Sequence, residues 1–298
     1  MRWLGAIAAL LCPILASGFD LQGHRGARGL APENTLQAFA TALAIGVTTL
    51  ELDTGVTRDG VVVIHHDRRL NPDIARGLDG LWVAAPAPLI RELSFAELQR
   101  YDVGRLRPGS KTAQNFPAQR AADGARVPRL AELFDLVKKS GHDAVRFNIE
   151  TKLSAQAEEE TLPPMEFARA VIAEIRKAGV ESRASIQSFD WRTLQVVERE
   201  APQISTVYLT DRRGTESQPV AVHAAGGRIW SPNHEATDSA AMVEARTLGL
   251  KVIPWTVNEP AAIERALDLG VDGLISDYPD RVRAQMARRG LHLLPGPR

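Results

Sequence analysis

The order of predicted strands and helices is the feature that most restricts the fold of this 298-residue chain. From residue 128 onward, short apolar or β-branched segments alternate strictly with longer amphipathic ones. Such alternation predicts a parallel sheet covered by helices, because parallel neighbours need a crossover connection. The segments expected to be strands are 20–24, 47–53, 61–65, 144–150, 183–188, 204–209, 228–230, 251–255 and 273–276. Those expected to be helices are 34–46 (capped by Asn34), 94–101, 130–140, 165–178, 191–201, 219–225, 239–248, 260–269 and 280–290.

Nine strand candidates are one too many for an eight-stranded barrel. The segment 61–65 follows its predecessor through a tight turn, so we expect it to run antiparallel and to lie outside the barrel. The other eight predict an α/β chain folded as a (β/α)8 TIM barrel. An open doubly wound sheet is the alternative, but it favours a glycine-rich phosphate loop after the first strand, which is missing here.

Two carboxylates and a histidine are predicted to converge on the hairpin that contains segment 61–65. Glu51 and Asp53 are two residues apart near the end of a strand, so their side chains share one face. The Asp-Gly pair that ends at Gly60 predicts a two-residue type I′ turn. In that register Asp53 faces His66, whereas a slip by one residue would bring His65 there instead.

Further polar residues follow the predicted strands at the end where barrel enzymes carry their active sites. They are His24 and Arg25 after the first strand, Glu150 and Lys152 at 144–150, Gln187 at 183–188, Trp255 at 251–255 and Asp277 after 273–276. Glu51, Asp53 and Glu150 are expected to meet, and three carboxylates suit Ca²⁺ or Mg²⁺. Zn²⁺ fits less well, because the only cysteine, Cys12, lies near the N-terminus.

Several of these residues also have simpler interpretations. Glu150 and Lys152 would form a surface ion pair if they bound no metal. Trp255 is expected either to pack in the core or to form an aromatic wall for the substrate. Gln187 and Asp277 are expected to support other site residues rather than to act as catalysts.

The N-terminus predicts a secretory signal over residues 1–18. Arg2 precedes the apolar run 3–15, and small residues follow up to Gly18, where cleavage is expected. A short membrane anchor is the alternative, although the run is too short to span a bilayer comfortably. The mature chain, 19–298, is then a single barrel domain that contains no cysteine and is secreted or periplasmic.

Composition excludes some partners. The formal net charge is zero, which removes the electrostatic case for nucleic acid binding. The mature chain has no apolar run of 18 residues, so no stable membrane insertion is expected after cleavage. Residues 68–127 are rich in proline and predict an insertion between the strands at 47–53 and 144–150. The acidic stretch 158–164 is expected to be a solvated loop without chemistry.

Short motifs occur in a fixed order between about residues 20 and 285. They are His-Arg-Gly at 24–26, Pro-Glu-Asn-Thr at 32–35, Glu-Leu-Asp at 51–53, Asp-Gly at 59–60, His-Asp at 66–67, Ile-Glu-Thr-Lys at 149–152, Ser-Phe at 188–189, Trp-Thr-Val-Asn at 255–258 and Ser-Asp-Tyr-Pro-Asp at 276–280. Together they resemble the glycerophosphodiester phosphodiesterase family. The resemblance implies a barrel of the phospholipase-C-like phosphodiesterase type with an insertion. It also implies a metal-dependent hydrolase that cleaves small-molecule glycerophosphodiesters to sn-glycerol 3-phosphate and an alcohol.

The same residues predict a mechanism. Arg25 or Lys152, together with the cation, would bind a phosphate oxygen and reduce the charge that repels a nucleophile. His24 and His66 would act as the general acid and base, in an order the sequence does not assign. In the family, the substrate's own 2-hydroxyl is one possible nucleophile. Trp255 would contact the glycerol or the alcohol.

Two other functions fit the same motifs. A phospholipase-D-like enzyme acting on lysophospholipids or sphingolipids would use the same residues but needs an exposed apolar rim. A secreted binding module with a decayed site would have lost Glu51, Asp53 or one of the two histidines, and all are retained. The head group, the preferred cation and the oligomeric state stay open.

Overall fold

The computed structural model describes residues 18–211, 217–291 and 293. The predicted signal segment therefore lies outside the described residues, apart from Gly18. Within the described part of the chain, no helix is long and apolar enough to cross a membrane.

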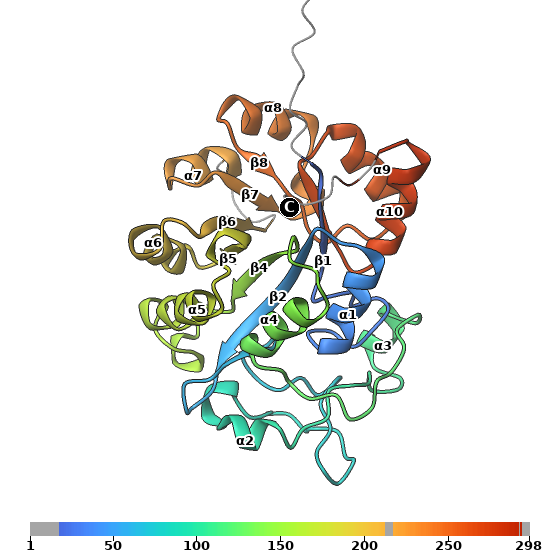
Figure 1. Cartoon of the computed structure of the whole chain (residues 1–298), viewed down its shortest axis with the longest axis vertical. Coiled ribbons are helices and arrows are strands. Elements are labelled where there is room, and N and C mark those ends of the chain that lie inside the picture. The colour runs from blue at the N-terminus through green and yellow to red at the C-terminus, as the bar shows by residue number, and fades with distance from the viewer. Residues whose placement is uncertain (1–17, 212–216, 292, 294–298) are drawn as a thin grey trace, which may run out of the picture.

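Eight parallel strands form a nearly closed barrel with helices around its outside (Figure 1). Hydrogen-bonded neighbours follow the order β8-β7-β6-β5-β4-β2-β1-β9. Between the two end strands, Asp272 N donates to Val252 O and Ile275 N to Pro254 O. The strands are β1 (Asp20–Gly23), β2 (Thr49–Val56), β4 (Arg146–Thr151), β5 (Ala184–Ser188), β6 (Ser205–Thr210), β7 (Ile229–Pro232), β8 (Lys251–Val252) and β9 (Gly273–Ser276). The predicted TIM barrel is confirmed.

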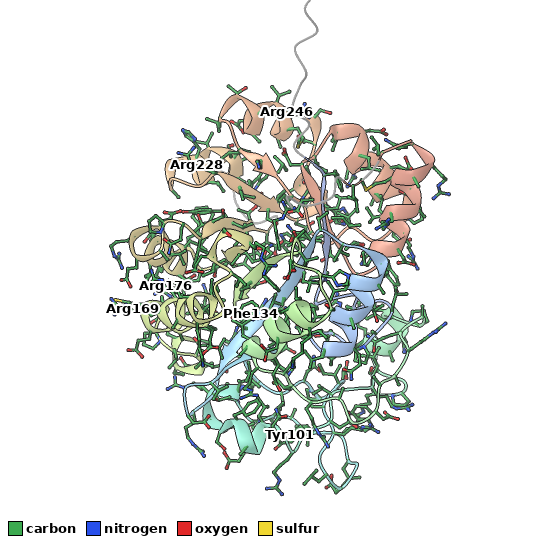
Figure 2. All side chains as sticks on the ribbon, viewed as in Figure 1. Tyr101, Phe134, Arg169, Arg176, Arg228 and Arg246 are labelled. Carbon is green, nitrogen blue, oxygen red and sulfur yellow. The ribbon has the colours of Figure 1, made fainter. Side chains whose placement is uncertain are left out.

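The helices outside the barrel bury one apolar face against it. For example, the ring of Phe134 on α4 packs edge-on against that of Phe147 on β4, with centroids 4.9 Å apart (Figure 2). Such packing closes the core between the helix layer and the sheet. The helices are α1 (Leu36–Ile45), α4 (Leu130–Lys139), α5 (Pro164–Ala178), α6 (Trp191–Glu200), α7 (Gln218–Ala224), α8 (Ser239–Thr247), α9 (Pro260–Leu269) and α10 (Pro279–Arg288).

The first helix begins one residue later than predicted. Thr35, not Asn34, is its N-cap, and the Thr35 side chain accepts a hydrogen bond from Ala38 N. Asn34 instead has a φ of 57°, a left-handed conformation in which asparagine is enriched. The expectation that Asn34 caps the helix was wrong, and its side chain is left available to the site described below.

The hairpin register differs by one residue from the prediction. The strand β3 (Val62–Ile64) does run antiparallel to β2 and outside the barrel, as expected. However, Thr54 pairs with Ile64, and His65 N donates to Asp53 O, so Asp53 faces His65 rather than His66. The cause is Gly60, whose φ of 80° makes a three-residue turn with a bulge instead of a two-residue type I′ turn.

The chain between β3 and α4 forms a lobe beside the barrel, which can be found in Figure 1 by the helix labelled α2. It holds only short elements: η1 (Ile90–Glu92), α2 (Phe95–Leu98) and α3 (Lys111–Asn115). The helix predicted over 94–101 is thus a single turn with Ser94 as its N-cap. A separate cluster of buried residues holds the lobe together, including Leu70, Ile90 and Leu98, with Tyr101 packed against it (Figure 2).

Candidate active site

The turn after β1 directs two functional residues toward the barrel mouth. Arg25 and Gly26 both have positive φ, at 50° and 86°. A Cβ on Gly26 would lie 2.6 Å from the carbonyl carbon of Ala38, so this position requires glycine. The turn brings Arg25 N to within 2.8 Å of Glu51 Oε2 and places His24 beside the same carboxylate.

Three carboxylates lie together at the ends of β2 and β4. Asp53 and Glu150 are register partners on these neighbouring strands, and Glu51 shares the Asp53 face. One oxygen from each of the three lies within 4.8 Å of the others. All three residues are buried, with 1%, 1% and 6% exposure for Glu51, Asp53 and Glu150. The carboxylates that the sequence predicted to meet therefore do so.

Neutral side chains hold two of these carboxylates in place. Gln187 Nε2 on β5 donates to Glu51 Oε1 at 2.7 Å. Asn34 Nδ2 donates to Asp53 Oδ2 at 2.9 Å. Such bonds orient the oxygens of a metal ligand without adding charge to the site.

Two cations lie against the cluster from different sides. Arg25 NH1 donates to Glu33 Oε1 at 2.7 Å, and its Nε lies 3.3 Å from Asp53 Oδ2. Lys152 Nζ donates to Glu150 Oε1 at 2.8 Å and lies 3.6 Å from Asp53 Oδ1. The predicted Glu150–Lys152 pair is thus present, but in a partly buried position at the barrel mouth rather than on an open surface.

Burial and mutual repulsion act on the three carboxyl groups. Burial, followed by the charge of Asp53, raises the pKa of Glu51 well above its usual range. Burial raises the pKa of Glu150 to about 7. Burial acts in the same direction on Asp53, but the positive charges of His66 and Arg25 outweigh it and lower the pKa of Asp53. Three carboxylates brought this close repel each other unless a positive charge lies among them.

The donor set fits a divalent cation with a preference for oxygen ligands. Asp53 Oδ1 is buried and has no hydrogen-bond partner, so one ligand oxygen is left over by the protein's own bonds. Buried polar atoms are rarely left in this way, and a metal ligand is one explanation. Glu51, Asp53 and Glu150 would hold the ion, with Ca²⁺ and Mg²⁺ equally compatible with an all-carboxylate set.

His24 is held by the opposite side of the barrel. Its Nδ1 lies 2.6 Å from Asp277 Oδ1, after β9. Asp277 also accepts bonds from Arg28 and from Asn258 Nδ2. Burial raises the pKa of Asp277, but the charges and hydrogen bonds of His24 and then Arg28 outweigh it and lower that pKa. An ionised carboxylate only accepts hydrogen bonds, so the His24 Nδ1 donates and its Nε2, 4.0 Å from Glu51 Oε2, is left for proton transfer. Burial lowers the pKa of His24 to about 4.

His66 reaches the same site from the hairpin. Because the chain leaves the ladder after Ile64, His66 lines the cavity at the barrel mouth although its register was mispredicted. Its Nδ1 lies 2.7 Å from Asp67 Oδ1, and Asn71 Nδ2 bonds the other Asp67 oxygen. Burial and the nearby charge of Arg25 lower the pKa of His66. His66 therefore also has its Nδ1 engaged by a carboxylate.

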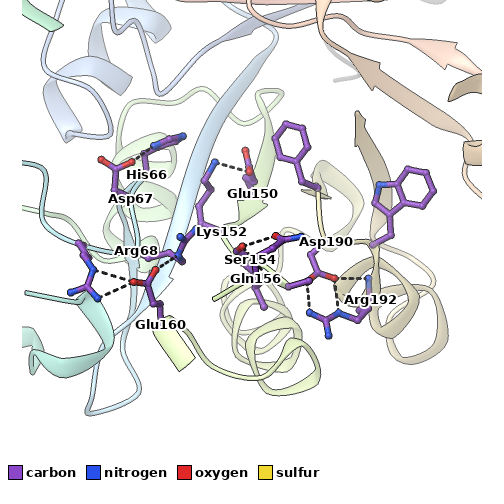
Figure 3. Close-up of a pocket in the computed structure, with 15 residues that line it drawn as sticks. His66, Asp67, Arg68, Glu150, Lys152, Ser154, Gln156, Glu160, Asp190 and Arg192 are labelled. Carbon is purple, nitrogen blue, oxygen red and sulfur yellow. Dashed lines mark hydrogen bonds and ion pairs between the residues drawn. The ribbon is translucent and has the colours of Figure 1, made fainter. Parts of the chain in front are cut away.

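A cavity of about 840 Å³ opens beside the cluster (Figure 3). Its inner end is lined by His66, Glu150 and Lys152. Phe189, 44% exposed, forms part of the wall and packs edge-on against Trp255, with ring centroids 5.4 Å apart. Trp255 is anchored by its Nε1, which donates to Ser231 O, so the two rings form an aromatic wall at the barrel mouth.

The acidic stretch at 158–164, expected to be a solvated loop without chemistry, is solvated only in part, since Glu158 and Glu159 are exposed and Glu160 is not. It contains the turn η2 (Glu158–Glu160), whose last side chain is 15% exposed and lines the cavity. Glu160 accepts bonds from Arg68 Nε at 2.6 Å and from Arg69 NH2 at 2.9 Å (Figure 3). The prediction failed because these partners lie 92 and 91 residues earlier in the chain.

Sequence reasoning also left the supporting residues without a definite role. The structure shows that Gln187 bonds Glu51 and that Asp277 bonds His24, so both support other site residues as expected. Asn34 and Arg28 were not assigned to the site. For Asn34 the available signal was its position in the motif at 32–35, next to a turn that places it in a left-handed conformation.

Comparison with known proteins gives a consistent assignment. The model of the glycerophosphoryl diester phosphodiesterase family matches residues 24–281. A glycerophosphodiester phosphodiesterase of Bacillus altitudinis is 30% identical, covering 87% of this chain and 94% of its own. A counterpart from Bacillus subtilis is 29% identical, covering 86% and 83%.

Solved structures agree in fold. A protein of the same family from Silicibacter pomeroyi has a TM-score of 0.87 and 38% identity, covering 93% of this chain and 95% of its own. A phosphodiesterase of Oleispira antarctica, solved with its product sn-glycerol-3-phosphate, has a TM-score of 0.72 and 22% identity, covering 91% and 97%. The match with the family model spans nearly the whole barrel and includes every residue of the site described above. This chain belongs to the glycerophosphoryl diester phosphodiesterase family.

Proposed function

We propose that this protein is a metal-dependent hydrolase that cleaves glycerophosphodiesters to sn-glycerol 3-phosphate and an alcohol. The observation that carries the proposal is the placement of two histidines around three buried carboxylates, each with its Nδ1 bonded to an aspartate. Paired imidazoles and an acidic metal cluster are what hydrolysis of a phosphodiester needs. Membership of the family and the product bound to the Oleispira relative support the same chemistry.

The two histidines would move the protons of the reaction. One imidazole Nε2 accepts the proton of the substrate's 2-hydroxyl as that oxygen attacks phosphorus, and the other donates a proton to the alcohol oxygen as its bond to phosphorus breaks. Water then opens the resulting cyclic phosphate to give sn-glycerol 3-phosphate, with the proton transfers reversed. Asp277 and Asp67 fix the orientation of His24 and His66 through their Nδ1 atoms. A Ca²⁺ or Mg²⁺ ion bound to Glu51, Asp53 and Glu150 would neutralise charge on the phosphate oxygens.

Arg25, Lys152 and Trp255 would bind the substrate. Lys152 lines the cavity, so its ammonium group can contact a phosphate oxygen there. Arg25 lies behind Asp53, where its charge adds to the positive potential at the phosphate. The wall formed by Trp255 and Phe189 would cover the carbon face of the glycerol.

The lining of the cavity favours a small polar diester over a lipid. Apart from a few apolar side chains, most lining residues are charged or polar, which disfavours the acyl chain of a lysophospholipid. The decayed binding module is disfavoured because the carboxylates and both histidines are retained with their partners. We further propose, from the sequence of residues 1–18, that the protein acts outside the cytoplasm, which N-terminal sequencing of the exported form would test.

The proposed activity is tested by incubating the purified protein with the glycerol, choline and ethanolamine diesters of sn-glycerol 3-phosphate. Release of sn-glycerol 3-phosphate, measured by a coupled dehydrogenase assay, is the expected result. Parallel incubation with lysophospholipids tests the alternative of a phospholipase-D-like enzyme. Release of lysophosphatidic acid or its cyclic form from lysophospholipids alone, with the soluble diesters untouched, would overturn the proposal.

A further inference from the structure

The outer part of the cavity is lined by polar and charged side chains that the proposed mechanism does not use. Figure 3 shows His66 and Glu150 at one end and the side chains of Arg68, Glu160 and Arg192 at the other. We define the outer half by its polar lining residues: Arg68, Arg69, Ser154, Gln156, Glu160 and Arg192. Three separate segments of the chain contribute these residues, so the wall exists only in the folded protein.

Arginines fix the turn η2 on both sides of this wall. Arg68 and Arg69 bind the Glu160 carboxylate, as described above. Arg91 NH1 from the lobe donates to the carbonyls of residues 159 and 161, at 2.6 and 2.8 Å. Arg192, near the start of α6, binds Glu158. Four guanidinium groups thus hold one acidic turn, which is far more than a solvated loop requires.

We propose that this outer half is the subsite for the alcohol of the diester and that the clamped turn η2 makes it selective for hydroxyl-rich alcohols such as glycerol. The inference rests on the proposed function and deepens it. With the phosphate beside Lys152 and the glycerol against Trp255 and Phe189, the departing alcohol extends past His66 into the outer half. A volume of about 840 Å³ accommodates both halves of such a substrate.

The charges of the outer half disfavour a quaternary ammonium group. The carboxylate of Glu160 is already paired with two arginines, and that of Asp190, which also lines the cavity, is paired with Arg192 at 2.6 Å. Arg192 also binds Glu158, so each of these carboxylates has a guanidinium partner. A choline cation would meet no free carboxylate in the outer half to replace its lost hydration, and binding it there would be unfavourable.

Hydroxyl groups have the opposite fit. A hydroxyl accepts a bond from a guanidinium N–H and donates one to a side-chain oxygen. Ser154 and Gln156 provide such oxygens at the rim, where Ser154 Oγ lies 3.0 Å from Gln156 Oε1. A site lined with paired polar groups discriminates against substrates that cannot complete its hydrogen bonds.

The test compares Glu160→Gln with Glu159→Gln. The two residues are adjacent and chemically alike, but Glu159 is exposed and only its carbonyl is bound, by Arg91. The substrates are the diesters of sn-glycerol 3-phosphate with glycerol, choline and methanol, the last too short to reach the outer half. The wild type should prefer the glycerol diester over the choline diester by about tenfold or more in kcat/KM.

In Glu160→Gln, kcat/KM for the glycerol diester should fall about tenfold, mainly through KM, because Arg68 and Arg69 lose their shared carboxylate. The methyl diester should change by less than about twofold, and Glu159→Gln should match the wild type on all three substrates. Gln156→Ala, which leaves the arginine contacts intact, should also lower kcat/KM selectively for the glycerol diester. This variant replaces Glu160→Gln in the test if the latter folds poorly.

Three results would count against this inference. A wild-type enzyme that prefers choline, or that cleaves all three diesters equally well, would overturn it while leaving the phosphodiesterase function in place. If Glu160→Gln lowers kcat/KM equally for all three substrates and Gln156→Ala leaves it unchanged, the arginine contacts to η2 have only a structural role. Absence of turnover of any diester by the wild type would overturn the proposed function and this inference with it.

Discussion

His24 and His66 make the same bond but are held by different parts of the molecule. His24 is fixed by Asp277, a buried residue after the last barrel strand that also bonds Arg28 and Asn258. His66 is fixed by Asp67, its half-buried neighbour in the chain, at the start of the lobe. The barrel therefore sets one imidazole rigidly, whereas the other depends on a short turn.

The difference shows how one active site can combine residues fixed by a sheet with a residue fixed by a loop. Residues at the ends of barrel strands are fixed by the hydrogen bonds of the sheet, so their relative positions tolerate little change. A residue on a loop is fixed only by local contacts, and its position depends on turn type.

Removal of the metal should have the largest effect, because it acts on the carboxylates between the two histidines. Excess chelator should abolish turnover and lower Tm, since Glu51, Asp53 and Glu150 repel one another without a bound cation. Added Mg²⁺ or Ca²⁺ should restore both quantities. Thermal unfolding and diester turnover are measured on the same samples, and full activity in excess chelator would contradict the metal site.

Replacement of either histidine by alanine should have the second-largest effect on turnover. We expect His24→Ala and His66→Ala each to lower kcat by about 10²–10⁴-fold, because each removes one proton-transfer group. Metal binding, measured by calorimetry, should stay close to that of the wild type. The matched control is His142→Ala, because His142 is partly exposed and its side chain bonds Ser140, away from the site. If one of the two site variants keeps nearly full activity, the acid–base pair is not the one proposed.

The fold and the core of the site could be predicted because both follow from periodic patterns. Alternating strands and helices specify the barrel, and the barrel brings Glu51, Asp53 and Glu150 together at the strand ends. The hairpin register could not be predicted in the same way, because the sequence of the turn fits more than one turn length. An Asp-Gly pair is compatible with a two-residue turn and with a three-residue turn that ends in a glycine bulge, and Gly60 adopts the second.

Contacts between distant loops were missed for another reason. The bond between Arg68 and Glu160 joins residues 92 positions apart in two irregular segments. Neither segment has a period that would align it with the other, so composition alone made the acidic turn resemble a solvated loop. Asn34 was misassigned because asparagine is favoured both as a helix cap and in the left-handed conformation that it adopts here.

Replacement of the two aspartates that bond His24 and His66 should lower kcat by different amounts. Asp277→Asn should lower kcat by about 10–100-fold, because an amide no longer holds His24 in the tautomer that leaves Nε2 free. Asp67→Asn should have a smaller effect, within about tenfold, because Asp67 is more exposed and water can replace its bond. In the double variant with His24→Ala, the Asp277→Asn change should cost almost nothing further in kcat. Full additivity of the two losses would show that Asp277 acts on something other than His24.

His65→Ala should give the smallest catalytic effect and tests the register directly. His65 faces Asp53 across the hairpin through its backbone, and its buried Nδ1 bonds Asp67 O, so it supports the turn that carries His66. His65 is buried, whereas His24 and His66 are both partly exposed, which argues against proton transfer from His65 to substrate. We therefore expect kcat to fall by less than about tenfold, while unfolding is easier by about 1–3 kcal/mol because a buried side chain is lost. Denaturant unfolding and steady-state kinetics on one preparation separate the two effects. If kcat instead falls as far as in His66→Ala while stability is unchanged, His65 is the residue that contacts the substrate and the roles of the adjacent histidines are reversed.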